Sequence, residues 1–372
     1  MRVRKIDTNS ARDVRRFIQV PFELYAGCPR WVPPLVGDLR FALNRRKHPF
    51  YSHSHADFFI AESDGRTVGR IAAIDHRNYN RFHGKQTAFF YYFDAIDDTG
   101  ISGALFDAAF SWARARGLNE LIGPKGMMRS DGAGLLVEGF EHRPAIGIPY
   151  NFPYYEKLVA AAGFEKVTDY LSAHLSAGWD LPDRIYRIAE KIKARRGFQI
   201  KPFASKREIR QWIPRIQSVI NTAFTHLPAH IPVTQEEMAL TAKSLATIAD
   251  PRLIKLIMKG DEIAGFVFAY PDISAGIQKA RGRIWPLGWI PILLEFKRTK
   301  WLNANGLALL PKYQGIGANA VLYAELVKSI KSFQFEHGDL VQVDESNTAS
   351  MRDMAAMGAE WYKRHRVYSR AL

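Results

Sequence analysis

A pattern of strands, turns and helices that occurs twice is the feature of this sequence that most restricts its fold. Residues 58–73 and residues 253–268 each contain two apolar runs joined by four polar residues that include glycine. Such a segment is typical of a β-hairpin. Each hairpin precedes a pattern that predicts a strand, a helix, a second strand, a short helix ending at glycine and a last strand. The sequence therefore predicts two copies of one fold, one after the other.

The length of the chain fits this duplication. It has 372 residues, and domains commonly have about 150. We predict an N-terminal domain at residues 1–178, a linker helix at 179–200 and a C-terminal domain at 201–372, because a basic amphipathic helix pattern separates the two copies. Each copy has enough apolar residues for its own core.

Charge and cysteine content narrow the partners and the compartment. The chain has 52 Lys and Arg against 37 Asp and Glu, a net charge of +15, which favours contact with anions. Nucleic-acid binding is one alternative and predicts a steep salt dependence, but no aromatic-basic motif or recognition helix supports it, so we expect none. The single cysteine, Cys28, excludes a disulfide framework and fits a cytoplasmic location.

The sequence also predicts neither a membrane-spanning helix nor a metal site. The longest apolar stretch, residues 284–296, contains two prolines and is shorter than the roughly 18 residues that suggest a span. The N-terminus is basic and polar, unlike a secretory signal. His48, His53 and His55 have no acidic or cysteine partner nearby in sequence, so a surface loop is the better interpretation.

The segment at residues 307–326 carries the clearest chemical signal. An apolar strand ends at Pro311, a turn with Gly315 and Gly317 follows, and a helix pattern then begins. The first N–H groups of a helix have no partner within the helix, and they bind phosphate oxygens together with the positive end of the helix dipole. Lys312 adds a positive charge at the rim. The turn is neither a P-loop nor a dinucleotide fingerprint, because the spacing of its glycines differs from both.

This turn resembles a motif of the GNAT superfamily of acyl-CoA-dependent N-acyltransferases. Residues 312–318, KYQGIGA, match its Arg/Gln-x-x-Gly-x-Gly/Ala turn with Lys in the first place, and Asn347 and Gly358 match a later frame. The resemblance implies tandem α/β (α+β) domains with mixed, mostly antiparallel sheets flanked by helices. It also implies transfer of an acyl group, acetyl in the first instance, from acetyl-CoA or another acyl-CoA to the amine of a small-molecule acceptor.

The same resemblance implies positions for the cofactor. The backbone N–H groups of the strand end are expected to polarise the thioester carbonyl, and the amides of the turn to hold the pyrophosphate. The cofactor-binding residues implied in this way are Leu309, Leu310, Lys312, Gln314, Gly315, Ile316, Gly317, Ala318 and Asn347.

The catalytic acid departs from the family pattern. The position at which the family often has a tyrosine, thought to protonate the departing thiolate, is Met354, and a thioether has no proton to give. Either another group serves, with Tyr313 as the candidate and Tyr323 as another tyrosine nearby, or the thiolate leaves unprotonated. Asp344 and Glu345, at the end of the following strand, are the predicted general bases for an ammonium nucleophile.

The first copy lacks the phosphate-binding turn and has an unusually long loop instead. Its turn, residues 97–100, contains two aspartates, which would repel a pyrophosphate, so one cofactor per chain is expected. The loop at residues 123–155 is long enough to suggest a function. The substrate-pocket candidates in it are Asp131, Glu138, Tyr150, Asn151, Tyr154 and Tyr155. The alternative is that the loop only covers the sheet, with Tyr and Asn satisfying buried backbone groups.

Residues 279–300 are basic at both ends around an apolar centre. This composition suggests a weak contact with an anionic membrane surface or one wall of an acyl-chain tunnel; an inserted strand or a core helix is the more common structure for such a segment. Two alternatives to acetyl transfer also stay open: transfer of an aminoacyl or long-chain acyl group, and a catalytically inactive CoA-binding module. The sequence does not identify the acceptor among amino acids, polyamines, sugar amines, antibiotics and protein lysines.

Overall fold

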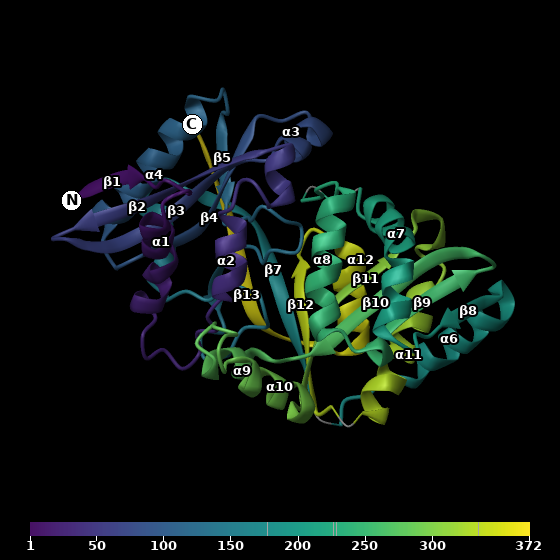
Figure 1. Ribbon diagram of the computed structural model, residues 1–372. Helices are drawn as coiled ribbons and strands as arrows, with labels where there is room; N and C mark the ends of the chain where they lie inside the picture. Colours follow the sequence, from purple (N-terminus) through teal and green to yellow (C-terminus); the bar gives the residue numbers. More distant parts are fainter. Residues whose placement is uncertain (177, 226, 228, 334) are drawn as a thin grey trace. The chain divides into compact units, whose positions relative to one another are not determined.

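The computed structural model (Figure 1) describes residues 1–176, 178–225, 227, 229–333 and 335–372. The chain divides into two compact units. Unit 1 consists of Met1–Leu171, Ile273–Glu295 and Tyr362–Leu372, and unit 2 consists of Ser172–Asp272 and Phe296–Trp361. This partition differs from the predicted division at residues 178–200, because unit 1 includes two segments from the second half of the chain.

Unit 1 is a mixed sheet flanked by helices. Its strands are β1 (Arg2–Lys5), β2 (His55–Ser63), β3 (Arg66–Asp75), β4 (Thr87–Ala95), β5 (Glu120–Gly123), β6 (Leu135–Glu138), the first part of β7 (Glu165–Leu175) and most of β13 (Glu360–Ala371). Its helices are α1 (Ala11–Leu24), α2 (Val36–Ala42), η1 (Pro49–Ser52), α3 (Arg77–His83), α4 (Thr99–Arg114), α5 (Tyr155–Ala161), α9 (Ser274–Lys279) and most of α10 (Trp289–Arg298). The strand order is β1-β2-β3-β4-β5-β13, with β6 also on β13, and β4 and β5 are parallel.

Aromatic packing forms the core of unit 1. Helix α4 places Leu105, Phe106, Ala109, Phe110 and Ala113 on its buried side, a spacing that forms one stripe along a helix. The rings of Phe106 and Phe90 lie 5.3 Å apart, edge to face. Burying one such side chain stabilises the fold by about 1.5–3 kcal/mol, so the aromatic cluster is a major source of the stability of this unit.

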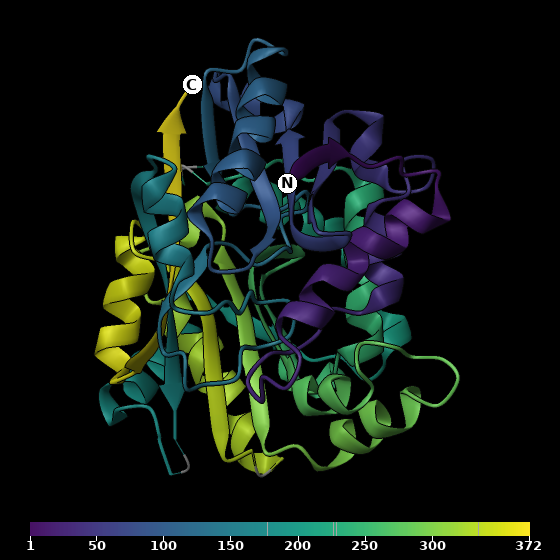
Figure 2. The same ribbon diagram turned by 90° about the vertical axis from the view of Figure 1, so that its left-hand side faces the viewer.

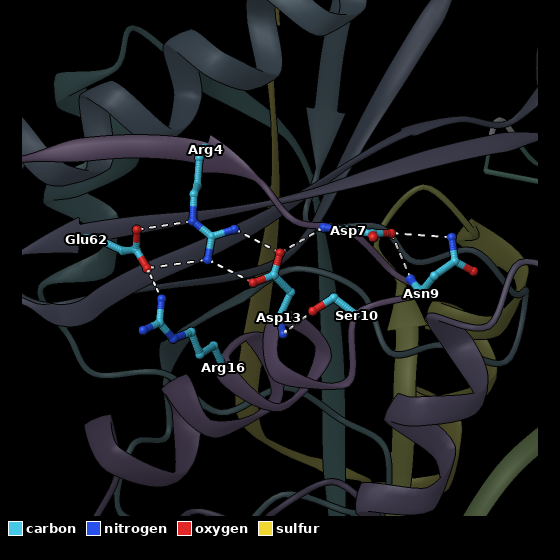
Figure 3. Close-up of polar contacts among 7 residues, drawn as sticks. All are labelled: Arg4, Asp7, Asn9, Ser10, Asp13, Arg16 and Glu62. Carbon is cyan, nitrogen blue, oxygen red and sulfur yellow. Dashed lines mark hydrogen bonds and ion pairs between the residues drawn. The ribbon is translucent and has the colours of Figure 1, made fainter.

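Ion pairs attach the N-terminal strand to α1 and β2 (Figure 3). Arg4 Nε donates to Glu62 Oε2 at 3.1 Å, and both terminal nitrogens of Arg4 donate to Asp13 at 2.9 Å. Arg16 also donates to Glu62. Hydrogen bonding from Arg4 lowers the pKa of Asp13 below its ordinary value. The first strand is therefore fixed by contacts with residues far along the chain as well as by its pairing with β2.

Unit 2 is also a mixed sheet flanked by helices. Its strands are β8 (Phe198–Lys201), β9 (Ile254–Lys259), β10 (Glu262–Pro271), β11 (Trp301–Leu309) and β12 (His337–Asp344). Its helices are α6 (Asp183–Arg196), α7 (Lys206–Ala223), α8 (Gln235–Ile248), η2 (Pro251–Leu253), η3 (Pro311–Tyr313), α11 (Ala318–Ser332) and α12 (Thr348–Met357). The strand order is β12-β11-β10-β9-β8, and β11 and β12 are parallel. One buried cluster combines residues of α6, α11 and α12 with the sheet, and another combines residues of α7 with it.

Local sequence signals are confirmed in both units. The two predicted hairpins are β2–β3 and β9–β10. The sequence Thr234-x-x-Glu237 is typical of a capping box, and it forms one at the start of α8: Glu237 N–H donates to Thr234 Oγ1 at 3.2 Å, and Thr234 N–H donates to Glu237 Oε2 at 2.9 Å. These signals act over a few residues, so the surrounding fold does not alter them.

The last strand predicted for each copy is confirmed: β7 follows the short helix α5, and β13 follows the short helix α12. Pairing joins β13 to β5, from Tyr368 with Gly123 to Ala371 with Glu120, so the C-terminal strand completes unit 1. Buried Asp169 on β7 accepts hydrogen bonds from Arg366 and Arg364 of this strand. Unit 1 therefore includes both ends of the chain.

Candidate functional site

The parallel strands β11 and β12 separate within unit 2. Pairing runs from Trp301 with His337 to Ala304 with Leu340 and then stops. Strand β11 nevertheless continues to Leu309, with an irregular register against β10 near its middle, and β12 continues to Asp344. Backbone groups on the facing edges of these later parts are thus directed into the space between the strands.

One of the predicted backbone donors fits this arrangement. Leu310 N–H donates to Ala264 O at 2.9 Å, so it is occupied within the sheet, and Pro311 has no N–H. Because successive backbone groups of a strand point in opposite directions, the N–H of Leu309 points away from β10, towards the side of β12. Of the backbone N–H groups predicted to polarise the thioester carbonyl, Leu309 N–H is therefore the one directed towards the space beside β12.

The glycine turn after β11 leads directly into α11. Gly315 and Gly317 have φ angles of 71° and 86°, which side chains other than glycine rarely adopt. Gly317 is the N-cap of α11, and no side chain of the described residues caps this helix. The turn is held in place by Gln314, whose Nε2 donates to Leu309 O at 2.9 Å. The first N–H groups of α11 are therefore not covered by a side-chain cap.

The two glycines of the turn differ in their surroundings. A Cβ on Gly315 would meet nothing within 4 Å. A Cβ on Gly317 would lie 3.0 Å from Ile192 Cγ1 and 3.2 Å from Ile188 Cγ2, both on α6. Helix α6 thus packs on the beginning of α11, and the predicted linker helix is part of the wall of the site.

Lys312 and Tyr313 are both bound to one carboxylate. Lys312 Nζ lies 2.8 Å from Glu262 Oε1, and Tyr313 OH donates to Glu262 Oε2 at 2.6 Å. This hydrogen bond raises the pKa of Tyr313, and that from Lys312 lowers the pKa of Glu262. A tyrosine with a raised pKa is a weaker acid, so the contacts give the predicted acid Tyr313 a role in holding the turn.

A pocket of about 200 Å³ begins at this turn and lies between α11, α12 and α6. It is lined by Arg184, Ile185, Ile188, Gly317, Asn319, Ala320, Tyr323, Asp353, Ala356 and Met357. Most of the lining is apolar, with a few polar groups, as is usual for small-molecule sites. Ala318 is buried next to it, and Ile316 packs against the core of unit 2.

Three polar side chains converge on the wall of this pocket. Asn319 Nδ2 donates to Asp353 Oδ2 at 2.6 Å, and Tyr323 OH donates to the same oxygen at 3.3 Å. Burial raises the pKa of Asp353 and also that of Tyr323. Neither Asn319 nor Asp353 was predicted from the sequence. The spacing of Asn319 and Tyr323, four residues apart on one helix face, is the signal that was present.

The structure around α12 shows why Met354, at the position where the family often has a tyrosine, is unsuitable as an acid. Met354 is buried in the core of unit 2, so this position faces the interior. Asn347 is the N-cap of α12 and accepts from Ser350 N–H at 3.2 Å. Asp344 is buried at the end of β12, where its Oδ1 accepts from Ser346 N–H, and Glu345 beside it is half-buried. The two predicted bases therefore lie where β12 ends.

The corresponding place in unit 1 is filled by the protein itself. Asp98 accepts from the N–H groups of Gly100 and Ile101, at 2.7 and 3.0 Å, and so caps α4. At the end of β4, Ala95 N–H donates to Tyr155 OH at 3.2 Å, and Tyr154 OH donates to Ala95 O at 2.8 Å. The backbone groups that unit 2 leaves uncapped are thus occupied in unit 1.

The substrate-pocket candidates of the 123–155 loop have mainly structural contacts. Asn151, which is buried, accepts from Leu136 N–H and donates to Leu136 O. Tyr155 is fully buried and bonded to Tyr25 OH at 2.9 Å. The others make these contacts: Asp131 accepts from Met128 N–H, Tyr150 OH donates to Phe140 O, and Glu138 pairs with Arg364. Satisfying the backbone of the loop, the alternative expectation, accounts for Asn151 and Tyr150.

Within the described residues, no group of three or more His, Cys, Asp or Glu side chains is placed to hold a metal ion. In the same part of the chain, no helix combines the length and the apolar character needed to cross a bilayer.

Two curated proteins are similar to this chain over nearly its whole length, whereas no family model matches it. The bacterial ceramide synthase of Caulobacter vibrioides is 28% identical over 99% of this chain and 97% of that protein. Protein YghO of Escherichia coli is 26% identical over 97% of this chain and 93% of that protein.

Solved structures with the same architecture are more distant in sequence. A tandem GNAT protein from the clavulanic acid biosynthesis pathway has a TM-score of 0.55 and 15% identity, covering 100% of this chain and 98% of that one. A GCN5-related N-acetyltransferase from Sphaerobacter thermophilus has a TM-score of 0.51 and 14% identity, covering 100% and 95%. These similarities confirm the fold predicted from the glycine turn and the repeat.

Proposed function

We propose that this chain, which has the tandem GNAT fold, transfers an acyl group from an acyl-CoA to an amine and binds the cofactor in unit 2. The observation that supports this most is the arrangement around Gly317. A helix that no side chain of the described residues caps begins shortly after a strand that has separated from its parallel neighbour, and a pocket opens at the same turn. In unit 1, by contrast, a carboxylate caps the corresponding helix.

The proposed cofactor contacts use backbone groups of the turn and the apolar walls of the pocket. The N–H groups of residues 315–319 bind the diphosphate, because they are positive and lack a side-chain cap. The apolar walls of α6 and α12 accommodate the pantetheine arm, and Arg184 at the rim adds a positive charge for a phosphate group. Lys312 contributes less charge than predicted, since Glu262 pairs with it.

The proposed reaction is direct attack of a neutral amine on the thioester carbon. A C–N bond forms, the attacking nitrogen loses a proton, the C–S bond breaks, and coenzyme A leaves as a thiolate that is then protonated. The N–H of Leu309 stabilises the negative charge that develops on the carbonyl oxygen, a contribution of about 2.7–4 kcal/mol to the barrier in comparable sites. Asp344 or Glu345 takes the proton that the ammonium group of the acceptor must lose.

The proton for the departing thiolate is assigned to Asp353, whose carboxyl accepts a hydrogen bond from Tyr323 OH. Both line the pocket, and burial raises the pKa of each. A carboxyl with a raised pKa is protonated more often at a given pH than an ordinary aspartate, so it can act as an acid. Met354 cannot contribute, because a thioether has no proton.

The acceptor proposed first for testing is a long-chain amine. The relative from Caulobacter vibrioides, similar over 99% of this chain, is named for the synthesis of ceramide, which is an amide of a long-chain amino alcohol. The proposed diphosphate contacts are the same for acetyl-CoA and for a long-chain acyl-CoA, so they do not distinguish the two donors. The length of the acyl chain is therefore tested together with the acceptor.

Calorimetry and a thiol-release assay test the proposal. Acetyl-CoA and palmitoyl-CoA are titrated first and then assayed with sphinganine, spermidine and lysine. We expect heat with the thioesters and release of free coenzyme A with sphinganine. Heat without thiol release for any amine would favour the inactive CoA-binding module, and the absence of heat would overturn the assignment of the site.

A pair of glycine variants links the heat to the turn. Gly315→Val introduces a side chain where the cofactor amides are assigned, and Gly65→Val, in the hairpin of unit 1, is the matched control. Both glycines have positive φ, 71° and 76°, and a Cβ on either one would meet nothing within 4 Å. Loss of heat only in Gly315→Val supports the proposal, and equal heat in both variants contradicts it.

A further inference from the structure

A large apolar face is exposed on unit 1. It consists of Ile284, Trp285, Leu287, Trp289, Ile290, Leu293 and Leu294, with exposed fractions between 38% and 79%. Trp285 and Leu287 are the most exposed of them, at 79% and 66%. Isolated exposed apolar residues are ordinary in proteins, but seven within eleven consecutive positions are typical of a surface that contacts a membrane or another protein.

The helix α10 turns its apolar residues outwards. Trp289, Ile290, Leu293 and Leu294 are spaced as one stripe along the helix, yet none of the residues of α10 is buried. The opposite side packs on α9: a Cβ on Gly276 would lie 2.8 Å from Ile292 Cα. The green segments in Figure 2 include these two neighbouring helices. The close contact with α9 fixes which side of α10 faces outwards, and the expectation of a core helix is therefore wrong.

The charges in the segment of the sequence that carries this face are almost all positive. Residues 273–300 contain six basic side chains and one acidic side chain, Glu295, which is half-buried on the inner side of α10. Lys297 and Arg298 occupy the last turn of α10 and are exposed. The six basic residues are Lys279, Arg281, Arg283, Lys297, Arg298 and Lys300.

We propose that the apolar face docks on the surface of an anionic lipid bilayer. Tryptophan and leucine side chains enter the boundary between headgroups and acyl chains, and basic residues beside them bind acidic headgroups. Charge complementarity favours this occupant over a second copy of the chain, because a symmetric contact would bring the same basic residues together. This inference goes beyond the proposed function and does not depend on it.

Vesicle sedimentation tests the proposal with the full chain. The vesicles are phosphatidylcholine alone or phosphatidylcholine with about 30% phosphatidylglycerol, a content that gives the surface a negative potential. We expect the chain to bind the anionic vesicles at least tenfold more tightly than the neutral ones, and binding to fall as salt rises. Equal or absent binding to both would overturn the proposal, as would full competition by free glycerol phosphate.

Substitutions separate the apolar part from the basic part. The double variant Trp285→Ser with Leu287→Ser removes the two most exposed apolar groups, and a tenfold or greater loss of vesicle binding is expected. Phe82→Ser with Val167→Ser is the matched control, since these residues of unit 1 are exposed by 44% and 48%. Equal binding by the two double variants contradicts the proposal.

The basic part is tested by Lys297→Glu with Arg298→Glu. This variant keeps the apolar face and is expected to lose the preference for anionic vesicles. Sedimentation equilibrium without lipid decides the competing occupant: a dimer that Trp285→Ser with Leu287→Ser converts to monomer would assign the face to a second copy and overturn membrane docking. Thiol release from soluble substrates, measured in parallel, reports on the site in unit 2 and not on this face.

Discussion

Replacing Asp169 by asparagine tests whether the C-terminal strand stabilises unit 1. The side chain of Asp169 is fully buried on β7. It accepts from Arg366 Nε at 2.9 Å, from Arg364 Nη1 at 3.0 Å, and lies 3.0 Å from Lys166 Nζ. Burial alone raises the pKa of this carboxyl, but hydrogen bonds from these three cations outweigh it and lower the pKa to about 2.

The lowered pKa gives the magnitude and the sign of the effect. One pKa unit corresponds to about 1.4 kcal/mol, so a fall from 3.8 to about 2 stabilises the folded state by about 2.5 kcal/mol. Because the folded pKa of Asp169 is depressed, this contribution is present above pH 3.8 and is lost as the pH falls towards 2. For Asp169→Asn we expect a loss of about 2–4 kcal/mol at neutral pH, since removing one member of a buried charge cluster leaves the others poorly paired.

Urea unfolding combined with hydrogen exchange measures this prediction. The free energy of unfolding comes from the urea midpoint, and exchange in a peptide covering residues 362–372 reports on β13 itself. Asp97→Asn is the control: this exposed carboxylate pairs with Lys157 at 3.2 Å, and such surface pairs contribute at most about 1 kcal/mol. If Asp169→Asn destabilises the chain no more than Asp97→Asn, or leaves exchange in β13 unchanged, the reasoning is refuted.

Three further predictions use the same stability measurements. Burial lowers the pKa of His365 to about 4, so the free energy of unfolding should fall by up to about 3 kcal/mol as the pH drops from 6.5 to 4. The variant His365→Gln should lack this part of the pH dependence. A variant with the same pH dependence as the wild type would contradict the prediction. Gly317→Ala should destabilise unit 2 by about 2–4 kcal/mol, because backbone strain adds to the contact of the new methyl group with Ile192 and Ile188. Gly315→Ala should destabilise it by about 1–2 kcal/mol, from backbone strain alone. Equal losses in the two variants would mean that α6 does not pack on the turn. Tyr155→Phe should destabilise unit 1 by about 1–3 kcal/mol, because it leaves Ala95 N–H without its acceptor; a change below about 0.5 kcal/mol in the free energy of unfolding would refute this role.

The shape of the glycine turn could be predicted from the sequence, whereas the contacts of the residues around it could not. The glycine turn at residues 312–318 was found because its positive φ angles require glycine at Gly315 and Gly317 whatever surrounds them. The contact of Lys312 and Tyr313 with Glu262 was not predicted. Glu262 lies at the start of β10, and no local sequence pattern connects it with the turn. Asn319 and Asp353 were missed for the same reason, since a pocket wall made of two helices appears only when both helices are placed.

The sequence by itself determined the elements: two hairpins, the capped start of α8, the strand, turn and helix around Gly315 and Gly317, and the repeat that contains them. These depend on side-chain periodicity and backbone preference over a few residues, which the chain carries wherever it folds. Only the tertiary structure decided which sheet receives β13, that Tyr155 occupies the backbone of β4, and that Met354 faces a core. Strand partners and burial are set by contacts between residues far apart in the sequence, 60 positions for Ala95 and Tyr155 and 245 for Gly123 and Tyr368. Such contacts are needed because every buried N–H and carbonyl must find a partner somewhere in the whole fold.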